Sequence, residues 1–172
     1  GDVYKRQGQQ CYEVPVGFKY ISAKMAETNA VIGGESSGGL AVRGHIAGKD
    51  GIYAAALLVE MLAVTGKSVS QLYQEITDKY GMLYYEDAAF TMTQARKAEL
   101  QEKLFVKLEV PDFGNGVEKI NRTDGCKVYF TDGSWVICRF SGTEPLLRMA
   151  AEGESQSQAR TYIRIWREEL GL

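Results

Sequence analysis

The sequence has few of the residues that catalytic and metal sites most often use. His45 is its only histidine, and Cys11, Cys126 and Cys138 form neither a C-x-x-C pair nor a Cys/His spacing typical of a metal site. Any Ser/His/Asp or Cys/His mechanism would depend on His45. We interpret His45 as a loop residue in preference to a catalytic base. Three cysteines without a pairing pattern fit a reducing compartment, so we expect a cytoplasmic protein.

An excess of one charge and long apolar runs are also absent. The net charge is −2, with both signs interspersed, so we expect no nucleic-acid partner. The longest apolar run, 54–59, is far shorter than the roughly 20 residues that cross a bilayer, and we expect neither a signal peptide nor a membrane partner. A hydrophobic share of 45% and a charged share of 24% are typical of a globular protein with one or two cores.

The first half of the chain has the pattern of an α/β segment. Residues 1–15 are predicted to be a leader, disordered or non-native, because residues 1–10 are polar and lack periodicity. A short helix follows from Val16, and 30–33 is predicted to be a buried strand that runs into the glycine-rich loop 33–39. This places the loop at the carboxyl edge of a sheet, where open α/β sheets bind ligands.

Helix signals dominate residues 50–81. Asp50 is predicted to cap a helix over 52–64 that is apolar on nearly every side and therefore buried, with Gly66 at its end. Ser68 opens a capping box before a further helix, and Gly81 is the predicted domain boundary. The segment 16–81 is thus interpreted as the end of a mixed α/β domain.

The second half, 82–172, is predicted to be an α+β domain whose antiparallel sheet is packed by helices. Extended residues 82–90 precede a helical stretch over 94–108, and two Asp-Gly pairs, at 124–125 and 132–133, indicate hairpins. A last helix follows another capping box at 155–158. Its predicted buried face consists of Ala159, Tyr162, Ile163, Trp166 and Leu170.

The turn 139–145, Arg-Phe-Ser-Gly-Thr-Glu-Pro, has the chemistry of a phosphate-binding loop. The guanidinium of Arg139 matches two phosphate oxygens, the hydroxyls of Ser141 and Thr143 are donors, and Gly142 allows backbone N–H groups to approach closely. An ordinary hairpin with turn-forming residues is the alternative. A lone turn of this kind favours that alternative.

The earlier loop, 33–39, has complementary chemistry. Glu35 and Ser37 can bind the vicinal hydroxyls of a sugar, although glycine-rich strand exits also occur for conformational reasons alone. One loop suited to hydroxyls and one suited to phosphate make a sugar phosphate the most economical ligand. Further candidate site residues, each of which could equally be a solvated or ion-paired surface side chain, are Lys19, Arg43, Lys49 and Arg148.

The segments 16–21, 34–39, 49–51 and 139–145 resemble, in order and spacing, the C-terminal part of the α-D-phosphohexomutases, the family of phosphoglucomutase and phosphomannomutase. The resemblance runs from about Val16 to the C-terminus. It implies a four-domain parent enzyme, of which this chain comprises the end of domain 3 (16–81) and the whole of domain 4 (82–172). It also implies a TATA-box-binding-protein-like fold for domain 4.

The resemblance also implies roles for individual residues. Glu35 and Ser37 would orient sugar hydroxyls, and Lys19 would correspond to an active-site lysine. The residues that would bind the phosphate that is not transferred are Arg139, Ser141, Gly142 and Thr143. Ser36 departs from the family pattern, which usually has a second glutamate there, and glucose and mannose preferences are not distinguished.

Two family elements have no counterpart in this sequence: the loop with the phosphorylated serine and the D-G-D-x-D-R loop that holds Mg²⁺. The resemblance implies Mg²⁺ and a hexose 1,6-bisphosphate for the parent enzyme, with none bound by this chain alone. We therefore expect a ligand-orienting portion that is inactive without the N-terminal domains. A free-standing, non-catalytic sugar-phosphate-binding module and an interaction domain whose loops are only turns are the alternatives.

Overall fold

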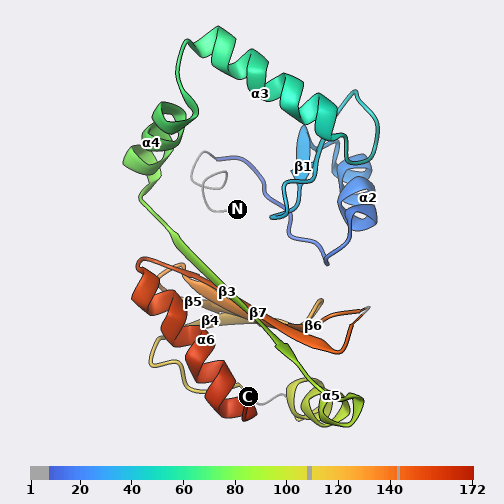
Figure 1. The fold of residues 1–172 in the computed structure, drawn as a ribbon, viewed down its shortest axis with the longest axis vertical. Coiled ribbons are helices and arrows are strands. Elements are labelled where there is room, and N and C mark those ends of the chain that lie inside the picture. Colours follow the sequence, from blue (N-terminus) through green and yellow to red (C-terminus); the bar gives the residue numbers. More distant parts are fainter. Residues whose placement is uncertain (1–7, 108–109, 143) are drawn as a thin grey trace. The chain divides into compact units, whose positions relative to one another are not determined.

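The computed structural model describes residues 8–107, 110–142 and 144–172, so the predicted leader lies partly, and Thr143 entirely, outside the described residues. The described chain forms two compact units, 1–81 and 82–172, which are considered separately (Figure 1). No single described helix is long and apolar enough to cross a membrane. The consecutive helices α3 and α4 meet that criterion only as a pair, across an 80° bend.

The described residues of unit 1 form three helices and one short antiparallel sheet. Its helices are α2 (Phe18–Thr28), α3 (Gly51–Thr65) and α4 (Val69–Tyr80), and its strands are β1 (Ile32–Gly34) and β2 (Leu40–Val42). Helix α2 packs directly on β1, because a Cβ at Gly33 would lie 2.6 Å from the Sδ atom of Met25. Only a glycine permits this close approach.

Strand β1 and the loop that follows it differ from the prediction in two ways. The strand exists, but Ile32 is exposed rather than buried. The loop after it turns back into β2, which the sequence patterns did not indicate, and the two strands pair antiparallel with Gly34 opposite Leu40. The glycine-rich loop is therefore a hairpin turn, and the prediction that it leaves the carboxyl edge of an open sheet was wrong.

Helices α3 and α4 begin and end as predicted. The Asp50 carboxylate accepts a hydrogen bond from the Tyr53 N–H at the start of α3, and Gly66 ends this helix in the left-handed conformation. Ser68 and Gln71 form the predicted capping box of α4. The predicted burial of α3 was wrong, because the described part of the chain buries none of its residues, and Ile52 is 87% exposed.

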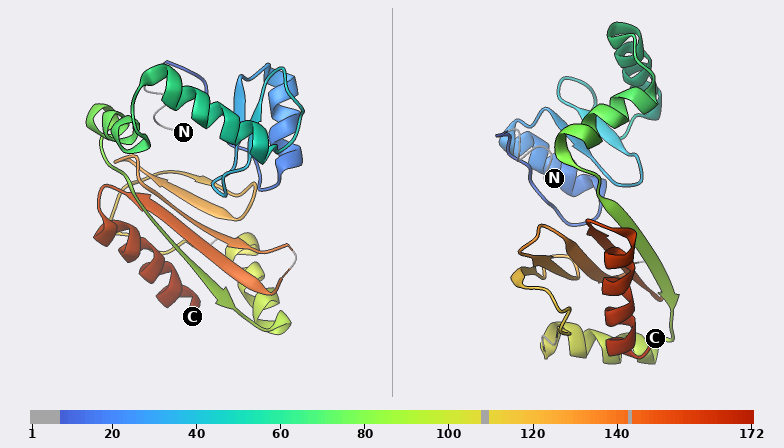
Figure 2. Two further views of the ribbon diagram at one scale, coloured as in Figure 1. Left: turned by 45° about the horizontal axis from the view of Figure 1, so that its top comes forward. Right: turned by 90° about the vertical axis from the view of Figure 1, so that its left-hand side faces the viewer.

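Unit 2 is built on a five-stranded antiparallel sheet in the order β3-β7-β6-β5-β4. Its strands are β3 (Tyr84–Thr91), β4 (Val117–Asn121), β5 (Cys126–Phe130), β6 (Trp135–Phe140) and β7 (Leu146–Gly153). Its helices are α5 (Gln94–Gln101), the π-helix η1 (Glu102–Val106) and α6 (Gln156–Leu170). The α+β architecture with an antiparallel sheet packed by helices is confirmed (Figures 1 and 2).

The core of unit 2 lies between the sheet and α6. Alternate residues of β5, β6 and β7 point into it, as the period of two predicts, and all five residues predicted for the inner face of α6 are buried. The second predicted capping box is only half formed. Ser155 caps the Gln158 N–H, but the Gln158 side chain accepts a hydrogen bond from the Glu154 N–H instead of that of Ser155.

Candidate functional site

The first candidate loop is the turn that joins β1 to β2. The backbone N–H of Glu35 donates to the carbonyl of Gly39 at 2.9 Å, and the N–H of Gly38 donates to the carbonyl of Glu35 at 3.0 Å. Gly38 has φ +91°, which a side chain would disfavour. These bonds close the turn and fix the direction in which Glu35 leaves the backbone.

The Glu35 carboxylate is held by two donors. Its Oε2 accepts a hydrogen bond from Lys49 Nζ at 2.7 Å and a second from Ser37 Oγ at 3.3 Å. The side chain of Glu35 is 18% exposed, whereas that of Lys49 is 51% exposed. The hydrogen bond from Lys49 is the main cause that holds the pKa of Glu35 below its ordinary value, so the carboxylate is ionised at neutral pH.

The stem of Lys49 lies directly on the backbone of the turn. A Cβ at Gly39 would lie 2.7 Å from Lys49 Cδ and 3.3 Å from Glu35 Oε2, so only glycine leaves room for this arrangement. Lys49 Nζ also lies 5.4 Å from the centroid of the Phe18 ring, at the start of α2. Glu35, Ser37 and Lys49 thus form one polar cluster beside the N-terminus of α2.

Lys19 and Arg43 have different surroundings. Lys19 is exposed, and its Nζ lies 4.9 Å from the ring centroid of the neighbouring Tyr20. Arg43 donates from Nη1 to the carbonyl of Asn29 at 2.8 Å, which is the C-cap of α2. Arg43 therefore stabilises the end of α2 opposite to Phe18.

The second candidate loop joins β6 to β7 in unit 2. The N–H of Ser141 donates to the carbonyl of Leu146 at 2.8 Å, and the Ser141 hydroxyl accepts from the N–H of Glu144 at 3.3 Å. Lys97 of α5 donates to the Ser141 carbonyl at 3.1 Å, which ties the loop to the helical layer. A Cβ at Gly142 would meet no atom within 4 Å, so the space beside this turn is open.

Arg139 and Arg148 lie at the base of this loop. They are direct partners in the antiparallel pairing of β6 with β7, so both side chains leave the same face of the sheet, opposite to the buried Cys138 and Met149. Arg139 is half-buried, and the exposed Arg148 lies 3.8 Å from Glu144 Oε2. Two arginine side chains therefore leave the same face of the sheet at the base of this turn.

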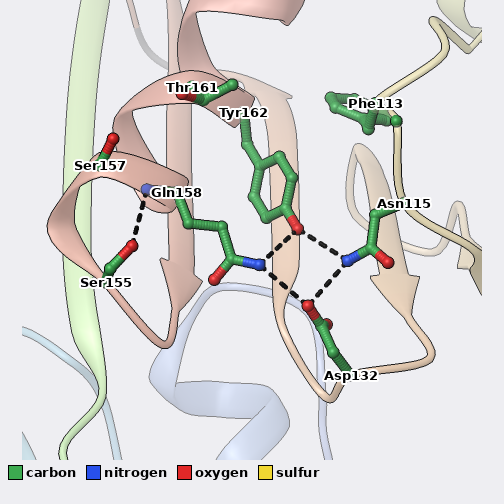
Figure 3. A pocket seen from close by; sticks show the side chains of 9 residues that line it. Phe113, Asn115, Asp132, Ser155, Ser157, Gln158, Thr161 and Tyr162 are labelled. Atoms are coloured by element: carbon green, nitrogen blue, oxygen red, sulfur yellow. Dashed lines mark hydrogen bonds between the residues drawn. The ribbon is translucent and has the colours of Figure 1, made fainter.

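A third polar group was missed by the sequence patterns. Asp132, Asn115, Gln158 and Tyr162 line an open pocket of about 470 Å³ near the N-terminus of α6 (Figure 3). Asn115 and Gln158 each donate to both Asp132 Oδ2 and the Tyr162 hydroxyl, at 2.8–3.0 Å. Gln158 and Tyr162 are four residues apart on α6, but the other partners are 17 to 47 residues apart along the chain, so no local pattern brings the group together.

Within this group the polar atoms bind one another. Burial acts to raise the pKa of Asp132, but hydrogen bonds from Ser134, Asn115 and Gln158 outweigh it and keep the pKa below its ordinary value. The arrangement ties the β5–β6 turn to α6, and we interpret it as a structural network. Among the described residues, no cluster of three or more His, Cys, Asp or Glu could hold a metal ion.

Two family models match the chain. Residues 1–80 match phosphoglucomutase/phosphomannomutase, alpha/beta/alpha domain III, and residues 88–165 match the C-terminal domain of the same family. The chain belongs to the phosphoglucomutase/phosphomannomutase family. The predicted resemblance is therefore confirmed.

Individual relatives agree with this assignment. A phosphoglucomutase/phosphomannomutase of Thermococcus kodakarensis is 33% identical over 171 residues, which are 99% of this chain and 34% of the relative. A probable phosphoglucosamine mutase of Methanosarcina acetivorans is 34% identical over 87% of this chain and 32% of its own length. A putative phosphomannomutase of Thermus thermophilus superposes with a TM-score of 0.73 at 25% identity, covering 99% of this chain and 33% of that structure. The chain thus spans about a third of the length of these relatives.

Proposed function

We propose that this chain supplies the sugar-binding and phosphate-binding loops of a phosphohexomutase. The parent enzyme would interconvert hexose 1-phosphate and hexose 6-phosphate through a phosphoserine and a hexose 1,6-bisphosphate. Membership of the family and the mutase names of the relatives support this reaction class. The remaining domains of the parent enzyme would correspond to the part of the longer relatives that this chain does not cover.

The observation that carries the proposal is the pairing of Arg139 with Arg148 beside the open turn at Gly142. A phosphate dianion between two guanidinium groups neutralises both, and the planar fork of Arg139 matches two of its oxygens. Ser141 shapes the turn, and together with Gly142 and Thr143 it would complete the site. This loop would hold the phosphate that is not transferred.

The cluster around Glu35 suits sugar hydroxyls. The ionised carboxylate of Glu35 accepts hydrogen bonds, and Lys49 and Ser37 donate them, so the cluster offers both kinds of partner that a hydroxyl pair requires. Lys19, next to Phe18 in α2, would add positive charge near the cluster. Arg43 would contribute indirectly, through the C-terminal end of α2.

Mg²⁺, which the resemblance implies, does not fit the described residues, since these offer no cluster of three ligating side chains. We place its ligands, and the serine nucleophile, in other domains of the parent enzyme. A metal ion there would neutralise charge on the phosphoryl group. We therefore propose that this chain binds hexose phosphate without turnover and folds without metal.

The test is an NMR titration of the ¹⁵N-labelled chain with inorganic phosphate, glucose and glucose 6-phosphate. We expect inorganic phosphate to shift the amides of loop 139–145, and glucose 6-phosphate to shift these and the amides of loop 34–39. Glucose is the matched control for the contribution of the phosphate group. If neither loop responds to glucose 6-phosphate at millimolar concentration, the two loops are only turns and the proposal fails.

A further inference from the structure

His45, the only histidine, is held on two sides by residues that have no role in the proposal above. Its Nε2 lies 2.8 Å from Asp50 Oδ2, and its ring stacks on Tyr53 with the centroids 4.0 Å apart and the planes 21° from parallel. The side chains of His45 and Asp50 are 32% and 29% exposed. The hydrogen bond and the stacking together hold the His45 ring in one orientation.

The two carboxylate oxygens of Asp50 serve two different segments. Oδ1 accepts a hydrogen bond from the Tyr53 N–H at 3.0 Å and caps α3, while Oδ2 binds His45. The hydrogen bond with His45 is also the largest cause that lowers the pKa of Asp50. Asp50 thus connects the loop before α3 to the first turn of that helix.

The loop 43–50 contains no regular helix or strand, and backbone hydrogen bonds from Arg43 to Val31 and from His45 to Val42 hold its start. Ser22 of α2 donates to the carbonyl of Ala47 at 2.8 Å, which fixes the middle of the loop. The pair of His45 with Asp50 spans its second half. Lys49 lies inside that span, directly before Asp50, and reaches Glu35 at 2.7 Å.

We propose that His45 and Asp50 are positioning residues that hold Lys49 against Glu35. The proposal rests on the role proposed above for Glu35 and Lys49 in sugar binding. A helix cap alone would not need His45, and a stacked histidine alone would not need an acceptor at Asp50. The hydrogen bond between His45 and Asp50 instead fixes the segment that carries Lys49, whose ammonium group completes the Glu35 cluster.

Two substitutions separate this role from the capping of α3. Asp50→Ser keeps a preferred N-cap but removes the acceptor of His45, and His45→Phe keeps a ring on Tyr53 but removes Nε2. The readout is the titration midpoint of the Glu35 side-chain carboxyl, followed by ¹³C NMR, with helix content from circular dichroism. Lys49→Ala gives the rise of the Glu35 midpoint on complete loss of the lysine. Ile46→Ala, at an exposed apolar position of the same loop, is the matched control.

We expect Asp50→Ser and His45→Phe to raise the Glu35 midpoint toward the ordinary glutamate value of about 4.3, while Ile46→Ala leaves it unchanged. The double variant should equal either single variant, because the two residues act through one contact. The dissociation constant for glucose 6-phosphate should rise on the order of threefold, as expected for the loss of one such contact. The dissociation constant for inorganic phosphate should not change.

If Lys49→Ala raises the Glu35 midpoint but Asp50→Ser and His45→Phe do not, the positioning role is overturned. It is also overturned if Lys49→Ala itself leaves the midpoint unchanged. A raised midpoint with unchanged glucose 6-phosphate affinity supports the positioning role and contradicts only the proposed sugar-binding function.

Discussion

Arg139 and Arg148 face each other directly across strands β6 and β7, so that two positive charges leave one face of the sheet as cross-strand partners. Like charges in such a pair destabilise a sheet by a few tenths to about 1 kcal/mol. The ion pair of Arg148 with Glu144, at 3.8 Å and exposed, offsets little of this cost. An anion bound between the two guanidinium groups would offset this repulsion.

Arg148→Ala tests this relationship. Without anions, the substitution should leave the melting temperature unchanged or raise it slightly, because the repulsion is removed. The dissociation constant for inorganic phosphate should nevertheless rise several-fold. Arg164→Ala, which removes an exposed arginine that pairs with Glu168 on α6, is the matched control and should not affect phosphate binding. A destabilised Arg148→Ala variant with normal phosphate affinity would show that Arg148 is structural.

Glu35→Gln should weaken binding of glucose 6-phosphate more than binding of inorganic phosphate. The substitution keeps the size of the side chain but removes the charge that Lys49 contacts and that accepts hydrogen bonds from hydroxyls. Inorganic phosphate has no such hydroxyl pair to lose. Calorimetric titration of both ligands measures the ratio, and an equal loss for both would refute the assignment of this loop to the sugar.

Asp132 should make unit 2 sensitive to acid. Its pKa is lower in the folded state than its ordinary value, so it contributes stability above about pH 4 that is lost as the pH falls through the folded pKa. Asp132→Asn lacks this contribution, and the difference in melting temperature between the two proteins should shrink from pH 6 to pH 2.5. Glu118→Gln, at an exposed position of β4, is the control. A difference independent of pH would mean that charge at Asp132 is unimportant.

The uncovered apolar residues of α3 should make the isolated chain associate. Ile52 and Val59 are 87% and 65% exposed and lie two turns apart on one side of the helix. Val59→Glu and Ile52→Glu should reduce both the fluorescence of a bound hydrophobic dye and the association seen by sedimentation, without loss of helix content. Leu57→Glu, at a half-buried position, should instead destabilise unit 1. If Val59→Glu and Ile52→Glu leave dye binding unchanged, the apolar surface that binds the dye lies elsewhere.

Local patterns predicted most of the secondary structure because they depend on neighbouring residues. The caps at Asp50 and Ser68 and the buried face of α6 follow from side chains within four or five residues of one another. The burial of α3 did not follow. An apolar helix shows which surface is unfavourable in water, but whether it is covered depends on other segments, and unit 1 contains only two three-residue strands among its described residues.

The candidate site was only partly predictable for the same reason. Glu35, Arg139 and their loops are visible as short motifs, whereas the hydrogen bond of Lys49 with Glu35 and the cross-strand pairing of Arg139 with Arg148 depend on how the chain folds back. The contact of His45 with Asp50 spans five residues and has no sequence pattern of its own. The contact of Arg43 with the carbonyl of Asn29, at the C-cap of α2, also depends on the fold and is not visible in the motifs.

The proposed role of this chain in a phosphohexomutase is testable by joining it to the N-terminal two thirds of the Thermococcus kodakarensis relative. Mutase activity of the joined protein is then measured with Mg²⁺ and a hexose bisphosphate. We expect turnover in the joined protein and none in the chain alone. Arg139→Lys should lower kcat/KM nearly as much as Arg139→Ala, by roughly tenfold or more, because an ammonium cannot replace the bidentate fork. Arg160→Lys, at an exposed position of α6, should have no effect. Full activity in Arg139→Ala, or turnover by the chain alone, would contradict the proposed role of this chain as the phosphate-binding part of the enzyme.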